Sequence, residues 1–441
     1  MTKKRYFRGS TSTEINPSVI TALEKDRPIK TFYSVIREIK EKGESVIDVA
    51  SSVEVDEIDM KVISAVVKEG HRESLKLGHY TEYPFSWGLP RLRESIANVF
   101  KRAAGINLNN LKEVMVTGGI VRAIDTAIQS LDITHVVIPS LAPYFARSLA
   151  LLRGKSLIEV SLDLKTGNFD LTTLEKKMVK QRVKKGKVLM YMTLPSAPAG
   201  TLPDEGFIED ELIPFAKRFN MPIISDTYVF ATTYSTKRIR PLMSYLGSRE
   251  VAVEAITVSK ELGLPGIRIG GCVGNPEIIN AMKVYTACSL EMLPTANQNI
   301  AAIALDKINP RPIGLRLKKS LAKEILPRFK KMNWPVIIPE AGLEMLVEIP
   351  KGFQEMNVAD HSLLASLSLL LQYQVAFCPA SVFGKDGDKY LRIVIKQKES
   401  KISNALDRLT DLGFDWKREK PSDGIVSRVN GLMEKLDLTR L

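Results

Sequence analysis

A regular alternation of short apolar runs and amphipathic segments between residues 111 and 305 limits the possible folds of this chain more than any other feature. Helical segments such as Val121–Leu131 and Pro276–Cys288 lie between apolar runs rich in β-branched residues. The predicted strands are Val114–Thr117, His135–Ile138, Leu157–Leu162, Val188–Thr193, Pro222–Ser225, Ala255–Val258 and Ile267–Val273. Continuous apolar runs are typical of strands covered on both faces. We therefore expect an α/β fold with a mainly parallel, seven-stranded sheet between helices.

The pattern changes after Pro310. A long basic helix is expected near Leu315–Met332, and shorter strand and helix segments follow it. This mixed order indicates a smaller α+β domain. The segments before Ser74 are too short to form a domain alone, so we expect them to complete the small domain. The predicted division is a large domain at 75–310 and a small domain built from 1–74 and 311–441.

Composition excludes several classes of protein. Hydrophobic residues make up 44% and charged residues 26% of the 441 positions, which are globular values. The cysteines Cys272, Cys288 and Cys378 stand far apart, without a CxxC motif, so we expect neither a metal site nor a disulfide framework. A cytoplasmic location is the expectation. We expect no membrane segment, because no apolar stretch is long enough and the N-terminal residues lack a secretory apolar region.

The most informative motif runs Thr257-Val-Ser259-Lys260-Glu-Leu-Gly-Leu-Pro-Gly-Ile-Arg268-Ile-Gly-Gly. In open α/β sheets ligands bind where strands end, and Lys260 follows an apolar strand. A lysine desolvated at such a place can act as a nucleophile or form a Schiff base. A lysine that simply points into water is the ordinary alternative, but it does not account for Arg268 and the hydroxyls of Thr257 and Ser259.

This segment resembles the lysine loop of the class I/II aminotransferases, fold type I enzymes that use pyridoxal 5′-phosphate (PLP). The similarity extends in order over Val46–Lys396 and implies an aspartate aminotransferase-like fold. It implies that Lys260 forms the aldimine with PLP and moves the proton at the substrate Cα. Arg268, beside Thr257 and Ser259, is implied to bind the PLP phosphate, a task suited to a guanidinium.

Two other strand ends fit the same cofactor. The strand before Gly119 and Ile120 ends in glycines and opens a helix, and backbone N–H groups at such an end bind phosphate. Asp226 ends an apolar strand, where a carboxylate is costly unless paired. The resemblance implies that Asp226 pairs with the pyridine nitrogen of PLP, although it could instead cap the next segment. The family's tyrosine three residues later is Val229 here, so Tyr228 is the expected substitute.

Three further aromatic and basic residues are assigned by resemblance. Tyr144 matches the aromatic residue that stacks on the PLP ring, with a core position as the alternative. Tyr83 matches the tyrosine that reaches the phosphate of the neighbouring subunit, which implies a homodimer. Arg392 lies in the apolar run Leu391–Ile395, where a charge needs a partner. The implied partner is the substrate α-carboxylate, and an exposed arginine is the alternative.

The chain also departs from the family pattern. Ala197 replaces the asparagine that donates to the cofactor ring oxygen, and Ser52 stands for the glycine that lies against the substrate. Our leading interpretation is a PLP-dependent aminotransferase that acts on an L-amino acid with a 2-oxo acid acceptor. The departures motivate an alternative, a non-transaminating PLP enzyme such as an oxidase, lyase, cyclase or decarboxylase. Glu291 and the absence of arginine from 281–310 favour a neutral or cationic amino acid.

The net charge leaves a third possibility. With 63 Lys+Arg against 50 Asp+Glu the formal charge is +13, which can indicate nucleic acid, an anionic ligand or solvated helix faces. A regulator that carries a PLP-type domain would need a DNA-binding module, and the roughly 45 residues before Val46 show no helix-turn-helix pattern. We therefore expect no nucleic-acid partner and assign most of the excess to surface helices.

Overall fold

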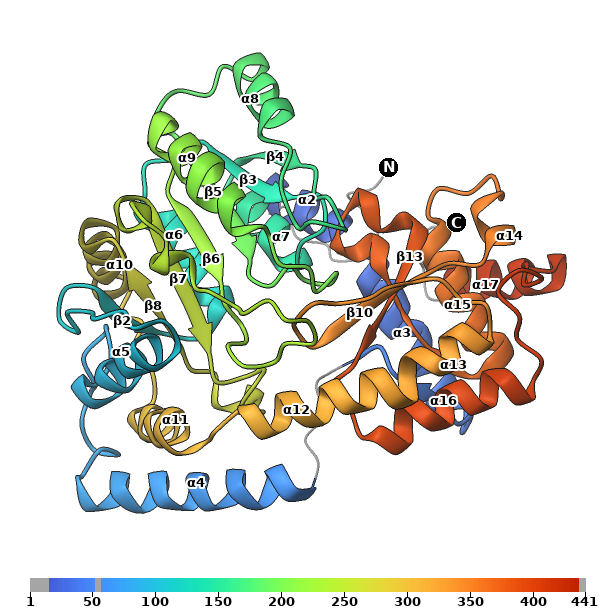
Figure 1. The fold of residues 1–441 in the computed structure, drawn as a ribbon, viewed down its shortest axis with the longest axis horizontal. Helices are drawn as coiled ribbons and strands as arrows, with labels where there is room; N and C mark the ends of the chain where they lie inside the picture. The colour runs from blue at the N-terminus through green and yellow to red at the C-terminus, as the bar shows by residue number, and fades with distance from the viewer. Residues whose placement is uncertain (1–15, 52–56, 436–441) are drawn as a thin grey trace, which may run out of the picture.

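A seven-stranded sheet in the order β2-β8-β7-β6-β5-β3-β4 forms the centre of the computed structural model (Figure 1). The structure describes residues 16–51 and 57–435. The strands are β2 (Val114–Thr117), β3 (His135–Pro139), β4 (Ser156–Val160), β5 (Val188–Thr193), β6 (Ile223–Asp226), β7 (Ala252–Thr257) and β8 (Gly270–Gly274). Strand β8 runs opposite in direction to the other six strands of this sheet. The predicted fold class is thereby confirmed.

Helices pack against this sheet and cover its apolar strands (Figure 1). They are α5 (Pro90–Ala104), α6 (Ile120–Ser130), α7 (Tyr144–Leu152), α8 (Leu171–Lys180), α9 (Ile213–Phe219) and α10 (Pro276–Cys288). Helix α11 (Thr295–Lys307) packs on α5. A π-helical turn, Phe207–Leu212, leads into α9. Every residue of β5 is buried, as expected for a strand covered on both faces.

A second, antiparallel sheet in the order β12-β13-β10-β9 lies beside the first (Figure 1). Its strands are β9 (Val336–Ile337), β10 (Glu344–Glu348), β12 (Cys378–Pro379) and β13 (Tyr390–Val394). Near it, β1 (Ile47–Asp48) pairs in parallel with β11 (Val375–Ala376), so early and late parts of the chain meet there.

The helices of this second region include one from the N-terminal part of the chain. They are α3 (Arg27–Glu41), α12 (Arg311–Ser320), α13 (Leu326–Lys331), α14 (Lys351–Gln354), α15 (His361–Tyr373), α16 (Glu399–Asp411) and α17 (Asp423–Lys435). A π-helical turn joins α12 to α13, and together they form the long basic helix expected there. Within the described ranges, no helix combines the length and apolar character needed to cross a membrane.

Two N-terminal helices pack away from the small sheet. Helix α2 (Pro17–Lys25) lies against α7, and α4 (Glu57–Lys76) lies against α11 at the bottom of Figure 1. Both partners belong to the range predicted for the large domain. The division at 74/75 and 310/311 stays a prediction.

One edge of the central sheet collects the chemically informative residues. The parallel strands β2, β6 and β7 end at this edge, which places Asp226 at the end of β6, and Gly119 and Lys260 shortly after the ends of β2 and β7. Because β8 is antiparallel, it starts at the same edge, at Gly270, two residues after Arg268. This is where open α/β sheets bind ligands.

The loop after β3 is tied to the second region by the buried guanidinium of Arg147. Its nitrogens donate to the carbonyl oxygens of Pro139, Ser140 and Ala142, and also to that of Phe383, which precedes β13. A single cation therefore satisfies four backbone acceptors from two parts of the fold.

Replacing this guanidinium tests its structural role. Arg147→Met leaves buried carbonyls without a donor, and each such group costs about 1–3 kcal/mol. We expect the free energy of unfolding to fall by roughly 3–5 kcal/mol, measured by urea denaturation. Arg418→Met is the control, because that side chain is 89% exposed beside Asp415, and little change is expected. Equal stability of the two variants would contradict the assignment.

Candidate active site

The backbone around Lys260 is held from two sides. The buried ammonium of Lys396 donates to the carbonyl oxygens of Lys260 (3.0 Å) and Glu261 (2.8 Å). The carboxylate of Glu261 accepts from the backbone N–H groups of Phe230 (2.9 Å) and Ala231 (2.8 Å). The Lys260 side chain itself is exposed. The fold therefore fixes the backbone from which this side chain starts, and none of the described residues forms a hydrogen bond or ion pair with its amine.

Gly119 and Arg268 form a second part of the site. Gly119 has φ +86° and stands directly before α6, and a Cβ there would lie 3.3 Å from Nη2 of Arg268. The Arg268 guanidinium therefore lies over the N-terminal turn of α6, which begins at Ile120. Nη1 of Arg268 donates to the Pro265 carbonyl (3.0 Å). Among the described residues no carboxylate pairs with Arg268, so the guanidinium and the helix N-terminus can share an anion.

Two hydroxyls stand at the same edge. Oγ1 of Thr257 donates to Oγ of Ser259 (2.9 Å) and lies 3.3 Å from the carbonyl of Ile269, next to Arg268. In the sheet Gly270 of β8 is paired with both Thr117 and Thr257, so the glycine turn after β2 and the lysine loop after β7 lie on either side of β8. A Cβ at Gly270 would lie 3.0 Å from the Gly119 Cα, so only glycine allows this approach.

Asp226 is a buried carboxylate with one satisfied oxygen. The hydroxyl of Tyr191 donates to its Oδ2 (2.9 Å), whereas Oδ1 is buried and finds no hydrogen-bond partner among the residues that the structure describes. Burial raises the pKa of Asp226 to about 7, although the Tyr191 hydrogen bond and the charge of Lys260 oppose the rise. Buried polar atoms are nearly always paired. The free Oδ1 therefore indicates an acceptor reserved for a ligand donor.

Two tyrosines predicted for the site have different environments. Tyr228 is buried, and its hydroxyl lies close to the backbone of Gly342, where a Cβ would approach within 2.5 Å. Burial, followed by the negative charges of Glu344 and Asp226, raises the pKa of Tyr228. Tyr144 opens α7 and is 39% exposed, so its ring is accessible for stacking and is not a core aromatic.

Arg392 is buried on β13 and already has protein partners. Its Nη1 donates to the Ala50 carbonyl (2.7 Å) and lies 3.7 Å from a carboxylate oxygen of Glu344. The guanidinium carbon is 5.2 Å from the centre of the Phe383 ring. Nε of Arg392 has no hydrogen-bond partner within the described part of the chain. The exposed-arginine alternative is wrong, and a hydrogen-bonding position remains for a ligand carboxylate.

One predicted residue, Tyr83, is not joined to this group by any hydrogen bond or ring contact among the described residues. Tyr83 is 92% exposed, and the described residues of the chain give it no hydrogen bond. Ser52 lies outside the described residues.

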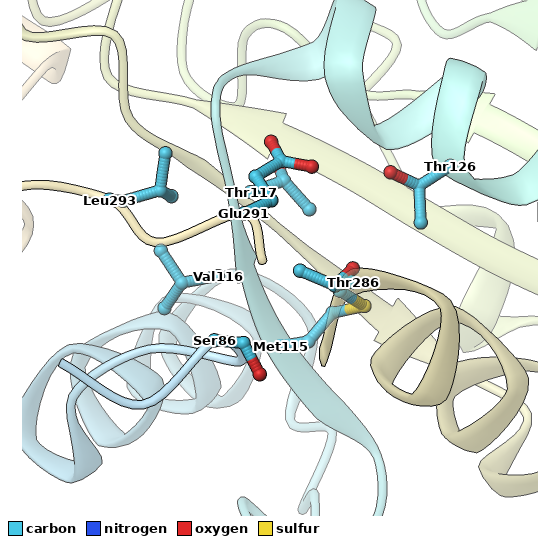
Figure 2. Close-up of a pocket in the computed structure, with 8 residues that line it drawn as sticks. All are labelled: Ser86, Met115, Val116, Thr117, Thr126, Thr286, Glu291 and Leu293. Carbon is cyan, nitrogen blue, oxygen red and sulfur yellow. The ribbon is translucent and has the colours of Figure 1, made fainter. Parts of the chain in front are cut away.

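Glu291 lines a narrow pocket beside the turn at Gly118 and Gly119. Figure 2 shows its carboxylate near Thr117, in a pocket that Ser86 and Leu293 also line. The carboxylate accepts from Nε of Arg122 (2.7 Å). The charge of Glu291 is thus neutralised by Arg122 on α6, so this carboxylate already has a protein counterion.

Sequence reasoning missed four residues that shape the site: Tyr191, Glu261, Glu344 and Lys396. Each is polar or charged within or next to an apolar run, and that is the signal by which Glu344 and Lys396 could have been found. Their partners lie on other strands or loops, so the contacts themselves required the fold.

Comparisons with known proteins show the family to which the chain belongs. The family model described as "Aminotransferase class I and II" matches residues 49–409, and the chain belongs to this family. It is similar to LL-diaminopimelate aminotransferase of Natranaerobius thermophilus, with 23% identity over 86% of this chain and 94% of that protein. It is also similar to L-glutamine–4-(methylsulfanyl)-2-oxobutanoate aminotransferase of Bacillus subtilis, with 23% identity over 88% of this chain and 95% of that one.

Solved structures give the same fold. The substrate-bound BacF structure from Bacillus subtilis has a TM-score of 0.78 and 22% identity, and the match covers 92% of this chain and all of that one. An aspartate aminotransferase from Thermotoga maritima has a TM-score of 0.74 and 21% identity, covering 90% of this chain and 99% of that chain. The predicted family, fold class and enzyme class, an aminotransferase, are confirmed.

The raised pKa of Asp226 predicts a pH dependence of stability. Between about pH 4 and 7 the folded chain holds a proton that the unfolded chain, with its ordinary value of 3.8, has released. The free energy of unfolding therefore falls as pH rises through this window. Asp226→Asn should remove up to about 4 kcal/mol of that fall, measured by urea unfolding of the cofactor-free protein.

A matched substitution controls for a general loss of charge. Asp210 is exposed, so Asp210→Asn should leave the slope of stability against pH as it is in the unsubstituted chain. If Asp226→Asn also preserved that slope, the buried carboxylate would not be the group that titrates.

Proposed function

We propose that this aminotransferase uses PLP to move an amino group from an L-amino acid to a 2-oxo acid through Lys260. The observation that carries the proposal is the position of Lys260, Asp226 and the Gly119–Arg268 pair at one edge of one sheet. An amine, an unsatisfied buried acceptor and an anion site there match the three functional ends of PLP. The aminotransferase names of the relatives support the reaction class.

The residues present fit the cofactor. Oδ1 of Asp226 is an orphaned acceptor that suits the ring N–H of PLP. The turn at Gly119 and Ile120, together with Arg268, suits the phosphate, with the hydroxyls of Thr257 and Ser259 beside it. Lys260 would hold the cofactor covalently, and Tyr144 would lie against its ring. When bound, PLP supplies an electron sink for the bonds at the substrate Cα.

Each protein group then has a defined task. Lys260 Nζ accepts the proton from the substrate Cα and returns it during transfer. Asp226, ionised beside a cationic donor, keeps the ring nitrogen protonated. Arg392 binds the α-carboxylate through the position left at Nε, and Tyr228 supplies a buried hydroxyl close to the reacting groups. Ala197 is buried and has no side-chain donor, which leaves Tyr228 as the proposed donor to the ring oxygen.

We further propose a homodimer in which Tyr83 reaches the neighbouring active site. The same segment of the chain carries two other exposed aromatic side chains, Phe85 at 61% and Tyr80 at 52% exposure. Ser86 lines the pocket beside the glycine turn (Figure 2), so this segment borders the proposed phosphate site. A second copy would cover these rings. Three free cysteines, two of them buried, support the proposed cytoplasmic location.

The first test removes the lysine. Lys260→Ala should lose the visible absorbance of the PLP-loaded enzyme and at least about 10³-fold of its turnover, since proton transfer and covalent catalysis both depend on this amine. In the unsubstituted enzyme, borohydride reduction and peptide mass spectrometry should locate a pyridoxyl group on Lys260. Lys283→Ala serves as the control lysine. A pyridoxyl group on another lysine would refute the assignment.

A panel of amino acids separates transamination from its alternative. An aminotransferase should convert bound PLP to pyridoxamine phosphate without a 2-oxo acid acceptor. Oxygen consumption or carbon dioxide release in place of that conversion would favour the oxidase or decarboxylase alternative.

The second test concerns the α-carboxylate. Arg392→Gln should raise the KM for every amino donor by about 10²-fold or more, since a buried charged hydrogen bond to a carboxylate is lost, while PLP stays bound. Arg311→Gln, at the exposed start of α12, is the control. Loss of PLP from the Arg392 variant, measured by absorbance after dialysis, would place Arg392 in the cofactor site instead.

A further inference from the structure

Glu344 brings an additional carboxylate to the proposed substrate site. It opens β10, and in the antiparallel ladder with β13 its neighbour Leu346 stands directly opposite Arg392. Residues 344 and 346 share one face of the strand, so Glu344 is the diagonal neighbour of Arg392. Its side chain is 20% exposed. The carboxylate is therefore held in place and still accessible to a ligand.

The contact with Arg392 neutralises the arginine without saturating it. The 3.7 Å separation is an ion pair but exceeds hydrogen-bond distance. Nε of Arg392 remains without a partner among the described residues. A substrate α-carboxylate can thus bind Arg392, and once it does, the charge of Glu344 loses its counterion.

Glu344 also acts on the other groups of the site. Its negative charge contributes, after burial, to the raised pKa of Tyr228, and it is a smaller cause of the raised pKa of Asp226. Gly342, two residues earlier, lies against the Tyr228 hydroxyl. Glu344 therefore lies near both Arg392, which is the proposed carboxylate position, and the buried tyrosine.

We propose that Glu344 is a specificity-determining residue that favours amino donors with a second cationic group and disfavours donors with a second carboxylate. The ammonium or guanidinium of such a side chain replaces Arg392 as the counterion of Glu344. A second carboxylate instead places like charges together, which costs affinity. This inference rests on the proposed function, because it takes Arg392 as the site of the α-carboxylate.

Binding of unreactive analogues tests the proposal directly. 2-Methyllysine and 2-methylglutamate lack the Cα hydrogen, so their affinities for the PLP-loaded enzyme can be measured by calorimetry without turnover. We expect the unsubstituted enzyme to prefer the cationic analogue by at least about tenfold, since one close charge pair accounts for that much. Glu344→Gln should lower this preference by about tenfold or more.

Two variants control for structural effects. Glu344→Asp keeps the charge and should keep the sign of the preference, and it serves as a second variant if the glutamine form does not fold. Glu348→Gln removes a carboxylate from the same face of β10 and should leave the preference unchanged. Glu344→Gln with an unchanged preference, or with equal losses for both analogues, would overturn the proposal.

Failure of the proposed function gives a different result. If no amino donor reacts and no pyridoxyl group is found on Lys260, the proposed function fails. If donors react but the preference does not depend on Glu344, only this inference fails.

Discussion

A buried carboxylate at the end of a strand, Asp226, is the constraint on which the rest of the site depends. Tyr191 satisfies one of its oxygens, and the other faces no donor among the described residues. Such a group costs stability until a ligand pairs with it. Glu254 provides the contrast: this fully buried carboxylate on β7 accepts from Thr227 and from the backbone of Met243. Of these two buried acids on neighbouring strands, Asp226 has a carboxylate oxygen without a donor among the described residues, whereas both oxygens of Glu254 accept hydrogen bonds.

The second sheet completes the site by approaching the first along β13. Arg392 lies on this strand. Lys396 stands two residues beyond the end of the strand, and its ammonium donates to the carbonyl oxygens of Lys260 and Glu261. The proposed carboxylate site and the backbone of the lysine are therefore attached to one short segment. A displacement of β13 would move Arg392 and the backbone of Lys260 together. The distance between the proposed carboxylate site and the lysine amine is therefore set by this one segment.

The sequence predicted the large sheet well because its strands are buried on both faces. The bounds of β2 and β5 match the expected ranges, whereas β8 begins three residues later than expected, because Pro265–Ile267 forms a 3₁₀ turn and Arg268 has φ +56°. A left-handed arginine cannot be deduced from apolar patterning. In the site, Lys260, Arg268 and Asp226 could be proposed because each adjoins a predicted strand end.

The remaining contacts depend on pairing between distant segments. The hydrogen bond from Tyr191 to Asp226 forms because β5 and β6 are neighbours in the sheet. The contact between Glu344 and Arg392 depends on the register of β10 against β13. A shift of that register by one residue would turn Glu344 to the other face of the sheet. The hydrophobic pattern of a strand shows which face of that strand a side chain lies on. It does not show which residue of another strand lies beside that side chain.

The two acids considered for substrate choice, Glu291 and Glu344, illustrate this limit. From the sequence, Glu291 was the visible candidate, because it stands where an arginine would favour dicarboxylic substrates. In the structure it is bound to Arg122, which also pairs with Asp125, and Asp125 in turn holds Arg153. Every charge in that group has a protein counterion, so Glu291 exerts little net field on a ligand. Glu344 differs because its counterion, Arg392, is also the proposed partner of the substrate α-carboxylate. When the substrate binds Arg392, Glu344 becomes available to pair with a cation on the substrate side chain, and this change of counterion is what would select substrates by charge.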